Sequence, residues 1–248
     1  MKNKLIIFFL SYFFLTNFTL AETFKFETSN IELIENGNLI YASNGRAISS
    51  DGELEIYSDK FEYNKELDLL KTFGKGSVLI KSKGIKIEFK NSIIDQKNLT
   101  IKAYGKVKIY QSDKKIIMET DEINFDRKNN VIKSETKTVL SDNNQNIYNF
   151  DNFLFEIEKN LLRIENANFK DNRNNKFYTS LAYLNTKTNK LFGKDVKVNL
   201  NNTSFEKNNE PRLKGNSVIN DYEVTEITKG VFTTCKRRDD CPPWQLSA

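Results

Sequence analysis

A strand-length pattern recurs in this chain at a fixed interval of 31 residues. It begins at Leu54, again at Ile85 and again at Ile116, and in each copy alternating apolar residues run into a polar turn. Self-similarity at a fixed period of this size indicates stacked repeats whose neighbouring units share one continuous core. A looser copy at 151–155 extends the series. We therefore expect a stack of β units.

Apolar and polar residues alternate along short segments from Phe24 to about Leu200. This period of two favours strands, with one face toward a core and the other toward water. Three glycines, Gly45, Gly76 and Gly105, precede such segments at matching places, which indicates a repeated tight bend. The expected strands include Val78–Ile80, Ile85–Phe89, Val107–Ile109 and Glu122–Phe125, and the expected turns include 50–52, 63–66, 82–84, 95–98, 126–130 and 186–189.

The first 21 residues have the order of a secretory signal peptide. Basic Lys2 and Lys4 precede an apolar run, and small residues lead up to Ala21, after which we expect cleavage. An uncleaved membrane anchor is the alternative, although the run is shorter than the ~20 apolar residues that a spanning helix needs. There is no cysteine near the cleavage site for lipoprotein modification. No later segment approaches the apolar length of a spanning helix.

The charge pattern excludes a nucleic-acid footprint. The chain has 38 basic and 33 acidic residues, a net charge of +5. Without Lys2 and Lys4 the mature chain keeps 36 basic residues against 33, a net charge of +3. Basic and acidic residues alternate along the strands and do not form the basic patch that binds nucleic acid. We expect no nucleic-acid partner.

The residue types argue against an enzyme. There is no histidine, which removes the commonest general base, most nucleophile pairs and most zinc sites. Carboxylates such as Asp59, Asp121 and Asp126 fall on turns and on the polar side of strands, where solvation explains them, although a glycosidase-type pair could be among them. No phosphate loop, nucleophile elbow or metal loop is present. We expect no catalytic residue, no cofactor and no metal.

The candidate functional feature is the apolar face of the stacked strands. Its residues would form an interior running along the stack, which in a repeat protein is by default a packed core. The functional alternative is a splayed interior that binds acyl chains, and the alternation fits both. The candidate lipid-binding residues are Leu54, Ile56, Phe61, Tyr63, Val78, Ile80, Ile85, Ile87, Phe89, Val107, Ile109, Ile116, Met118, Ile123, Phe125, Phe153 and Phe155.

The pattern changes after about residue 200. A polar stretch leads to a further alternating segment, and then to a block with both cysteines, Cys235 and Cys241, and the single Trp244. In an exported protein these cysteines can be oxidised, either to each other or to cysteines elsewhere. With no histidine and no other cysteine, a metal site is not expected. The strand-like ending at Ala248 indicates a chain that is cut short.

Two segments resemble a known family. The unit at 105–109 and 118–126, GKVKI followed by METDEINFD, resembles the OstA-like periplasmic domain of the lipopolysaccharide-transport proteins. The later GVFTTC at 230–235, followed by CPPWQLSA at 241–248, resembles the junction between that domain and the outer-membrane barrel in the LptD-like lipopolysaccharide-assembly family. The repeat unit is degenerate, whereas the second block is more specific, and together they cover most of the mature chain.

The resemblance implies an all-β fold, an elongated jellyroll of stacked antiparallel strands with an open apolar interior. It implies a non-enzymatic domain in the periplasm, at the outer membrane, that binds lipopolysaccharide and passes it toward a barrel. The implied partners are lipopolysaccharide, an LptA-like bridge joined by strand-edge pairing, the barrel, and its LptE-like lipoprotein plug. The implied organisation is a signal peptide at 1–21, an OstA-like domain at 22–200 and a junction at 201–248, and Cys235, with Cys241 less firmly, would bond to the barrel's far end.

The chain departs from that family in lacking a cysteine near the mature N-terminus and in lacking the barrel. Two other functions stay open at this stage. One is a free-standing bridge protein of the LptA or LptC kind, which is favoured if the gene ends at Ala248. The other is a solid β-solenoid that acts as a surface adhesin or degrades polysaccharide, for which a core without a cavity would be evidence.

Overall fold

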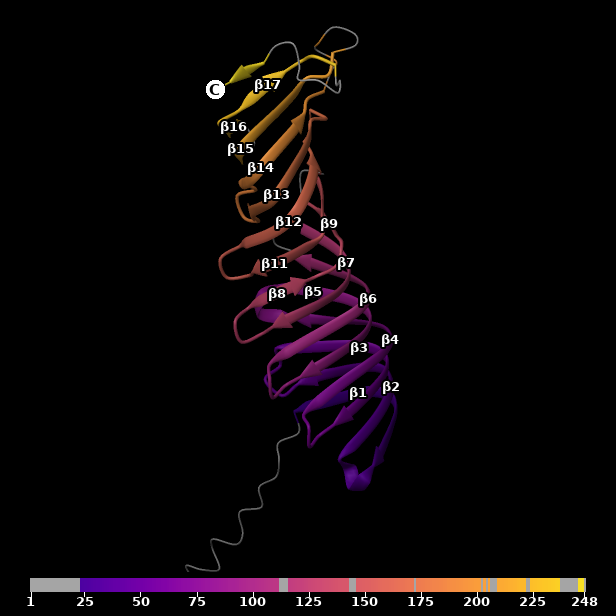
Figure 1. Cartoon of the computed structure of the whole chain (residues 1–248). Helices are drawn as coiled ribbons and strands as arrows, with labels where there is room; N and C mark the ends of the chain where they lie inside the picture. Colours follow the sequence, from indigo (N-terminus) through magenta and orange to yellow (C-terminus); the bar gives the residue numbers. More distant parts are fainter. Residues whose placement is uncertain are drawn as a thin grey trace, which may run out of the picture.

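The protein is an elongated stack of antiparallel strands (Figure 1). The computed structural model describes residues 23–111, 116–142, 146–171, 173–201, 203, 205, 209–221, 224–236 and 245–247. The strands lie across the long axis, with β1 near one end and β17 near the other. The all-β, stacked-strand architecture expected from the sequence is confirmed, whereas the signal-peptide prediction at 1–21 lies outside the described residues.

One antiparallel sheet contains all the described strands. Two single turns of 3-10 helix interrupt them, η1 (Glu35–Gly37) and η2 (Lys81–Lys83). The strands are β1 (Phe24–Ile34), β2 (Leu39–Ser49), β3 (Leu54–Asn64), β4 (Leu69–Ile80), β5 (Ile85–Asp95), β6 (Thr100–Gln111), β7 (Ile116–Asp126), β8 (Val131–Ser134), β9 (Thr138–Ser141), β10 (Ile147–Phe150), β11 (Asn152–Glu156), β12 (Leu161–Lys170), β13 (Lys176–Asn185), β14 (Leu191–Asn199), β15 (Arg212–Asn220), β16 (Thr225–Thr228), β17 (Val231–Thr233) and β18 (Leu246–Ser247).

Strand pairing follows chain order, with one exception in the middle. From β1 to β7 each strand pairs with the next. The sheet then divides, because the beginning of β7 pairs with β9 and its end with β8. Strands β10 and β11 continue these two branches, and β12 pairs with both. Pairing from β12 to β15 is again sequential, so the sheet continues across the expected boundary near residue 200.

Each long strand bends near its middle, and we call this position the corner. Pairing shifts register there, for example between Ser58 and Lys60, and Asn44 and Gly105 adopt left-handed backbone conformations. Such bulges bend a strand and increase its twist. The predicted glycine bends are confirmed, but they lie inside long strands such as β2 and β4. The short strands expected at Val78–Ile80 and Val107–Ile109 are therefore halves of longer ones.

The corners divide the sheet into two facing walls. The first wall contains the strand halves that meet at the β2–β3 and β4–β5 turns, and the second contains the halves that meet at the β1–β2 and β3–β4 turns. Aromatic rings connect them across the interior: Phe24 of the first wall lies edge-on to Tyr63 of the second, with ring centroids 5.2 Å apart. Phe26 meets Phe61 in the same way at 5.8 Å. The apolar core lies between these walls.

Backbone hydrogen bonds join the turns at the free edge of each wall. In the second wall the N–H groups of Gln96 and Arg127 donate to the carbonyls of Asp68 and Leu99, each one turn back along the stack. In the first wall the Lys81 N–H donates to the Glu53 carbonyl. We call the turns at these two free edges the first and second turn rows.

Gly76 at the corner of β4 provides a test of the bend. A Cβ there would lie 2.6 Å from Phe89 Cε2 and 2.9 Å from the Tyr57 carbonyl oxygen. We expect Gly76→Ala to lower the free energy of unfolding by about 1–3 kcal/mol, because neither neighbour can move without disturbing the corner. Urea titration monitored by circular dichroism measures the effect.

Gly230→Ala is the matched control, because the nearest atom to its added Cβ is Ile227 Cγ2 at 3.4 Å, an ordinary contact. Equal stability of the two variants would contradict a close-packed corner at Gly76.

Candidate functional site

All seventeen candidate lipid-binding residues lie in the interior between the walls. Each is 4% exposed or less, and all belong to one apolar cluster. The first wall contributes eleven of them, on β3 to β7, and the second contributes the other six, on β3, β7 and β11. The first-wall residues are Leu54, Ile56, Val78, Ile80, Ile85, Ile87, Phe89, Val107, Ile109, Ile116 and Met118, and the second-wall residues are Phe61, Tyr63, Ile123, Phe125, Phe153 and Phe155.

The interior is closed at these positions. Exposures this low mean that water does not reach the side chains, and the Phe24–Tyr63 and Phe26–Phe61 contacts bring the walls together. The sequence correctly assigns these residues to one face, but the open interior that the family resemblance implies is here occupied by their own side chains. The reason is geometric: large aliphatic and aromatic groups from both walls fill the space between them.

Further buried apolar residues that sequence reasoning did not select belong to the same interior. Leu70, Ile94 and Ile101 lie within the repeated strands, and the others extend the interior toward both ends. They follow the same period of two, so the alternation could have found them. They include Phe24, Ile40, Leu70, Ile94, Ile101, Ile132, Leu140, Tyr148, Phe150, Leu162, Ile164, Phe169, Phe177, Leu184, Leu191, Val196, Val198 and Val218.

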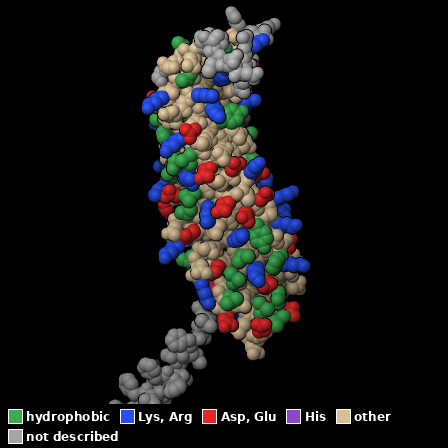
Figure 2. Space-filling model, viewed as in Figure 1, with side chains coloured by type: hydrophobic (Ala, Val, Ile, Leu, Met, Phe, Trp, Pro, Cys, Tyr) green, Lys and Arg blue, Asp and Glu red, His purple; other side chains and the backbone are tan. Residues whose placement is uncertain are grey.

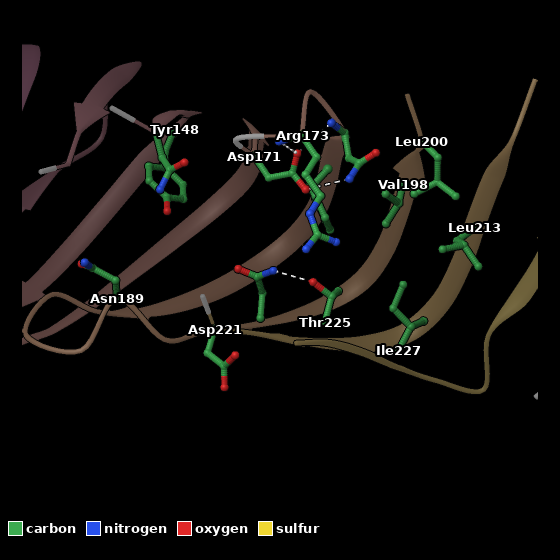
Figure 3. A pocket seen from close by; sticks show the side chains of 14 residues that line it. Tyr148, Asp171, Arg173, Asn189, Val198, Leu200, Leu213, Asp221, Thr225 and Ile227 are labelled. Carbon is green, nitrogen blue, oxygen red and sulfur yellow. Dashed lines mark hydrogen bonds between the residues drawn. The ribbon is translucent and has the colours of Figure 1, made fainter. Parts of the chain in front are cut away.

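A cavity of about 330 Å³ interrupts the packing toward the C-terminal end (Figure 3). Its apolar lining comes from Tyr148, Phe177, Val198, Leu200, Leu213 and Ile227, and its polar lining, which we call the polar rim, comes from Asn146, Asp171, Arg173, Asn175, Asn189, Asn220, Asp221 and Thr225. The volume is at the lower end of the range found for small-molecule sites. An apolar lining with a polar rim matches a molecule that has a tail and a hydrophilic head.

Arg173 supplies the cationic group of this rim. The Arg173 side chain extends into the cavity in Figure 3. The neighbouring Asp171 carboxylate accepts hydrogen bonds from the Arg173 N–H at 3.0 Å and from the Asn175 N–H and Nδ2 at 2.8 and 2.7 Å. The Asp171 carboxylate is therefore occupied by hydrogen bonds within its own turn. The Arg173 guanidinium is placed to donate hydrogen bonds to an acceptor in the cavity.

The free edge of β1 is the second candidate for an interaction. Among the described residues β1 pairs only with β2. Ile31 and Leu33 lie opposite Ala42 and Ile40 on the inner face, yet they are 55% and 60% exposed, because no further strand covers them. An unpaired strand with exposed apolar residues favours pairing with another chain. Figure 2 shows hydrophobic side chains gathered toward this end on the face in view.

The structure describes one of the two cysteines. Cys235 follows β17 and is half-buried, its N–H donates to Thr233 Oγ1 at 3.2 Å, and its carbonyl accepts a hydrogen bond from Arg212. It is a free thiol with respect to the described part of the chain. Cys241 lies outside the described residues, so the pairing of either cysteine stays a prediction.

The carboxylates considered for catalysis support the backbone. Asp59 accepts a hydrogen bond from the Lys75 N–H at the β4 corner, and Asp126 accepts from the N–H and Nδ2 of Asn129 in a turn. The backbone and side-chain hydrogen bonds from Asn129 hold the pKa of Asp126 below its usual value, against an opposing effect of burial. Within the described ranges no group of three or more acidic or cysteine side chains is placed to hold a metal ion.

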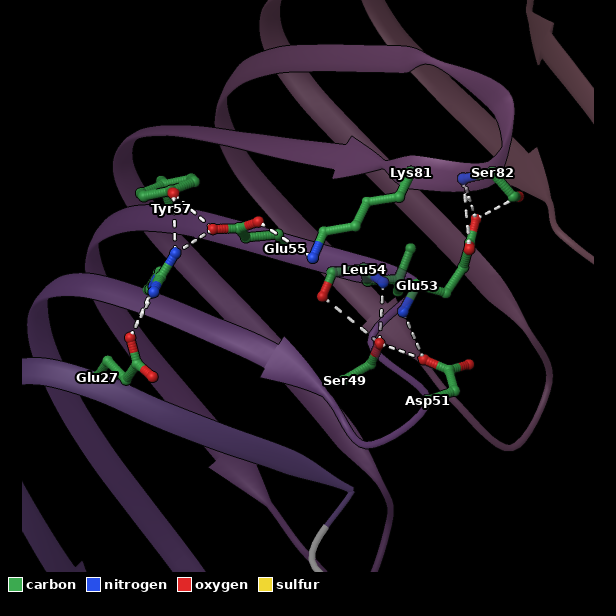
Figure 4. Close-up of polar contacts among 10 residues, drawn as sticks. Glu27, Ser49, Asp51, Glu53, Leu54, Glu55, Tyr57, Lys81 and Ser82 are labelled. Carbon is green, nitrogen blue, oxygen red and sulfur yellow. Dashed lines mark hydrogen bonds and ion pairs between the residues drawn. The ribbon is translucent and has the colours of Figure 1, made fainter.

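An ion network crosses the outer surface of the first strands (Figure 4). Arg46 pairs with Glu27 at 2.7 Å and with Glu55, and Glu55 also accepts a hydrogen bond from Tyr57 at 2.6 Å. Hydrogen bonds from Arg46 and Lys25 lower the pKa of Glu27, and those from Tyr57 and Arg46 lower the pKa of Glu55. The network connects strands on the outside and does not reach the interior.

The comparisons with known proteins add no relative. The sequence matches no protein-family model and no curated protein. Across the part of the chain that the structure describes, no helix has the length and apolar character to cross a membrane. The interior, the cavity and the motif resemblance are therefore the features that bear on function.

The packed interior predicts a large difference between inward and outward substitutions on β5. Ile87 is fully buried whereas its neighbour Lys86 is exposed. We expect Ile87→Ala to lower the free energy of unfolding by about 2–5 kcal/mol through lost burial and a residual cavity. Lys86→Ala should change it by about 0.5 kcal/mol or less. Chemical denaturation measures both, and similar losses would contradict the assignment of faces.

The ion network predicts an acid-sensitive stability. The pKa values of Glu27 and Glu55 are lower in the folded chain than their ordinary 4.5, so their contribution is present above pH 4.5 and is lost as the pH falls through the folded values. We expect the melting temperature to fall between about pH 5 and pH 3, and Arg46→Gln to flatten this dependence. Identical pH profiles for the two proteins would contradict this role of Arg46.

Proposed function

We propose that this chain is a periplasmic, non-enzymatic domain that binds lipopolysaccharide and passes it toward the outer membrane, as in the LptD-like family that it resembles. The observation that carries the proposal is the apolar interior, which continues from wall to wall along the stack and contains all seventeen candidate residues. Acyl chains lying along this interior would be shielded from water, while the sugars and phosphates remained outside.

The transfer of acyl chains from water into the interior is favourable once the walls move apart. Each methylene that leaves water for an apolar environment contributes about 0.8 kcal/mol, so a single acyl chain contributes several kcal/mol. Separated walls without a ligand would expose their own apolar residues, which opposes opening. Lipid binding and wall separation are therefore coupled, and the closed interior is the form without lipid.

The cavity is the proposed site at which the lipid first binds. The polar rim with Arg173 can accept a charged headgroup, and the apolar lining leads to the interior through Phe177 and Val198. Arginine donates paired hydrogen bonds to phosphate or carboxylate groups, which suits the headgroup of lipopolysaccharide.

The partners belong to the same proposal. The free edge of β1, with Ile31 and Leu33 uncovered, suits strand pairing with an LptA-like bridge protein. The outer-membrane barrel, its LptE-like plug and a disulfide from Cys235 follow from the resemblance alone. A free-standing bridge protein of the LptA or LptC kind would use the same interior, and gene sequence beyond Ala248 distinguishes the two.

The closed packing favours a second candidate, a solid β-solenoid with a structural or adhesive role. Interior residues that are 4% exposed or less are what a core that never opens would show. The two candidates differ in whether lipid is ever found between the walls.

Photocrosslinking in cells distinguishes them. A photoreactive amino acid at Ile87 or Phe125, which face the interior from opposite walls, should capture lipopolysaccharide. Leu213 borders the cavity and is only partly buried, so a label there tests the same claim without displacing core packing. The controls are the outward neighbours Lys86 and Asn124.

Capture at Ile87, Phe125 or Leu213 and not at the control positions would support the conduit. Capture only at Lys86 and Asn124, in proteins shown to be folded by protease resistance, would support the solid solenoid.

A further inference from the structure

Two ion pairs connect the first turn row to the second. Asp51, in the β2–β3 turn, lies 3.9 Å from Arg127 in the β7–β8 turn. Lys83, in the β4–β5 turn, pairs with Glu158 in the β11–β12 turn. The partners are 76 and 75 residues apart in the chain, so both pairs span nearly the same offset along the stack. They are repeats of one contact between the free edges of the walls.

This contact closes the side of the molecule opposite the corners. At the corners the walls are joined covalently through every long strand, whereas among the described residues no backbone hydrogen bond joins the two turn rows. The corners can therefore act as a hinge, and the turn rows form a seam that can separate without breaking a strand pairing. Among the described residues, backbone hydrogen bonds run from turn to turn along the second turn row, and one joins the β2–β3 and β4–β5 turns of the first.

The four charged groups differ in how firmly they are held. Arg127 is well enclosed, with its side chain 11% exposed, and it also donates a hydrogen bond to Gln96 in its own turn row. Asp51 is held by its own turn, where it accepts hydrogen bonds from Ser49 and from the Glu53 N–H. Glu158 is largely exposed. Separating the seam would thus leave Arg127 and Asp51 in place on their own rows.

We propose that the seam between the two turn rows is the lateral entrance to the interior, and that the pairs Asp51–Arg127 and Lys83–Glu158 are the latches that keep it closed. Opening leaves Arg127 and Lys83 on opposite edges of the entrance, without their carboxylates. The entrance therefore suits an amphiphile with an anionic head, whose phosphate or carboxylate replaces the lost partner while its tail enters between the walls.

The latches are weak individually, as an entrance requires. Partly exposed ion pairs of this kind change an equilibrium by only a few-fold and are screened by salt. This inference rests on the proposed function only for the identity of the admitted molecule, because the latches themselves follow from the geometry.

Uptake of a neutral apolar fluorophore, N-phenyl-1-naphthylamine, by the purified full chain measures opening without lipopolysaccharide. We expect Lys83→Glu and Glu158→Lys each to raise the initial uptake rate about two- to fivefold. The exchanged double variant, with both substitutions, should return the rate toward that of the unchanged chain. The differences should diminish at ~1 M salt, where screening is nearly complete.

Lys86→Gln is the matched control, because it removes an exposed pair, Lys86–Glu88 at 2.7 Å, that lies within β5 and does not cross the seam. Equal uptake by the Lys83→Glu variant and this control, or no recovery in the exchanged variant, would overturn the latch. Circular dichroism confirms that each variant is folded.

The experiments distinguish a failure of the proposed function from a failure of the latch. If photocrosslinking captures no lipopolysaccharide while the seam variants change fluorophore uptake as expected, the seam opens but admits another amphiphile. If lipopolysaccharide is captured and the seam variants behave like the control, the latch is refuted and the conduit stands.

Discussion

The bend in the middle of each long strand is the constraint on which the rest of the structure depends. A flat antiparallel sheet with alternating residues would leave its apolar face uncovered. Register shifts and left-handed residues such as Asn44 and Gly105 fold the long strands over, so that the sheet covers its own apolar face. The two walls, the interior and the meeting of the turn rows all follow from this repeated bend.

Most of the fold is present in the sequence because the side-chain period of a strand fixes which residues share a face. The alternation places Ile87 inside and Lys86 outside, and the recurring pattern from Leu54 predicts the stacking. The division of β7 between β8 and β9 could not be predicted, because it depends on which distant segments compete for its edge. Whether the interior is open or packed depends on the distance between the walls, to which an alternating pattern is insensitive.

The ion pairs of the seam show a different limit of sequence reasoning. Asp51 and Arg127 lie in turns, where charged residues are ordinarily solvated and carry no signal of a partner. Their pairing requires the tilt of the strands and the offset between the walls, which only coordinates provide. Under the proposed function, an interior lined on both sides by apolar residues and a weakly held seam would make closure and lipid occupancy exclude each other. Exposed apolar area costs about 25 cal/mol per Å², so an open form without lipid is disfavoured.

The most direct test of this account is a structure of the full chain determined after incubation with lipopolysaccharide. The account predicts acyl chains between the walls, in contact with Ile87 on one side and Phe125 on the other, and a wider separation of Asp51 from Arg127 than the present 3.9 Å. An unchanged, closed interior with lipid absent, or bound only to the outer faces of the strands, would contradict it.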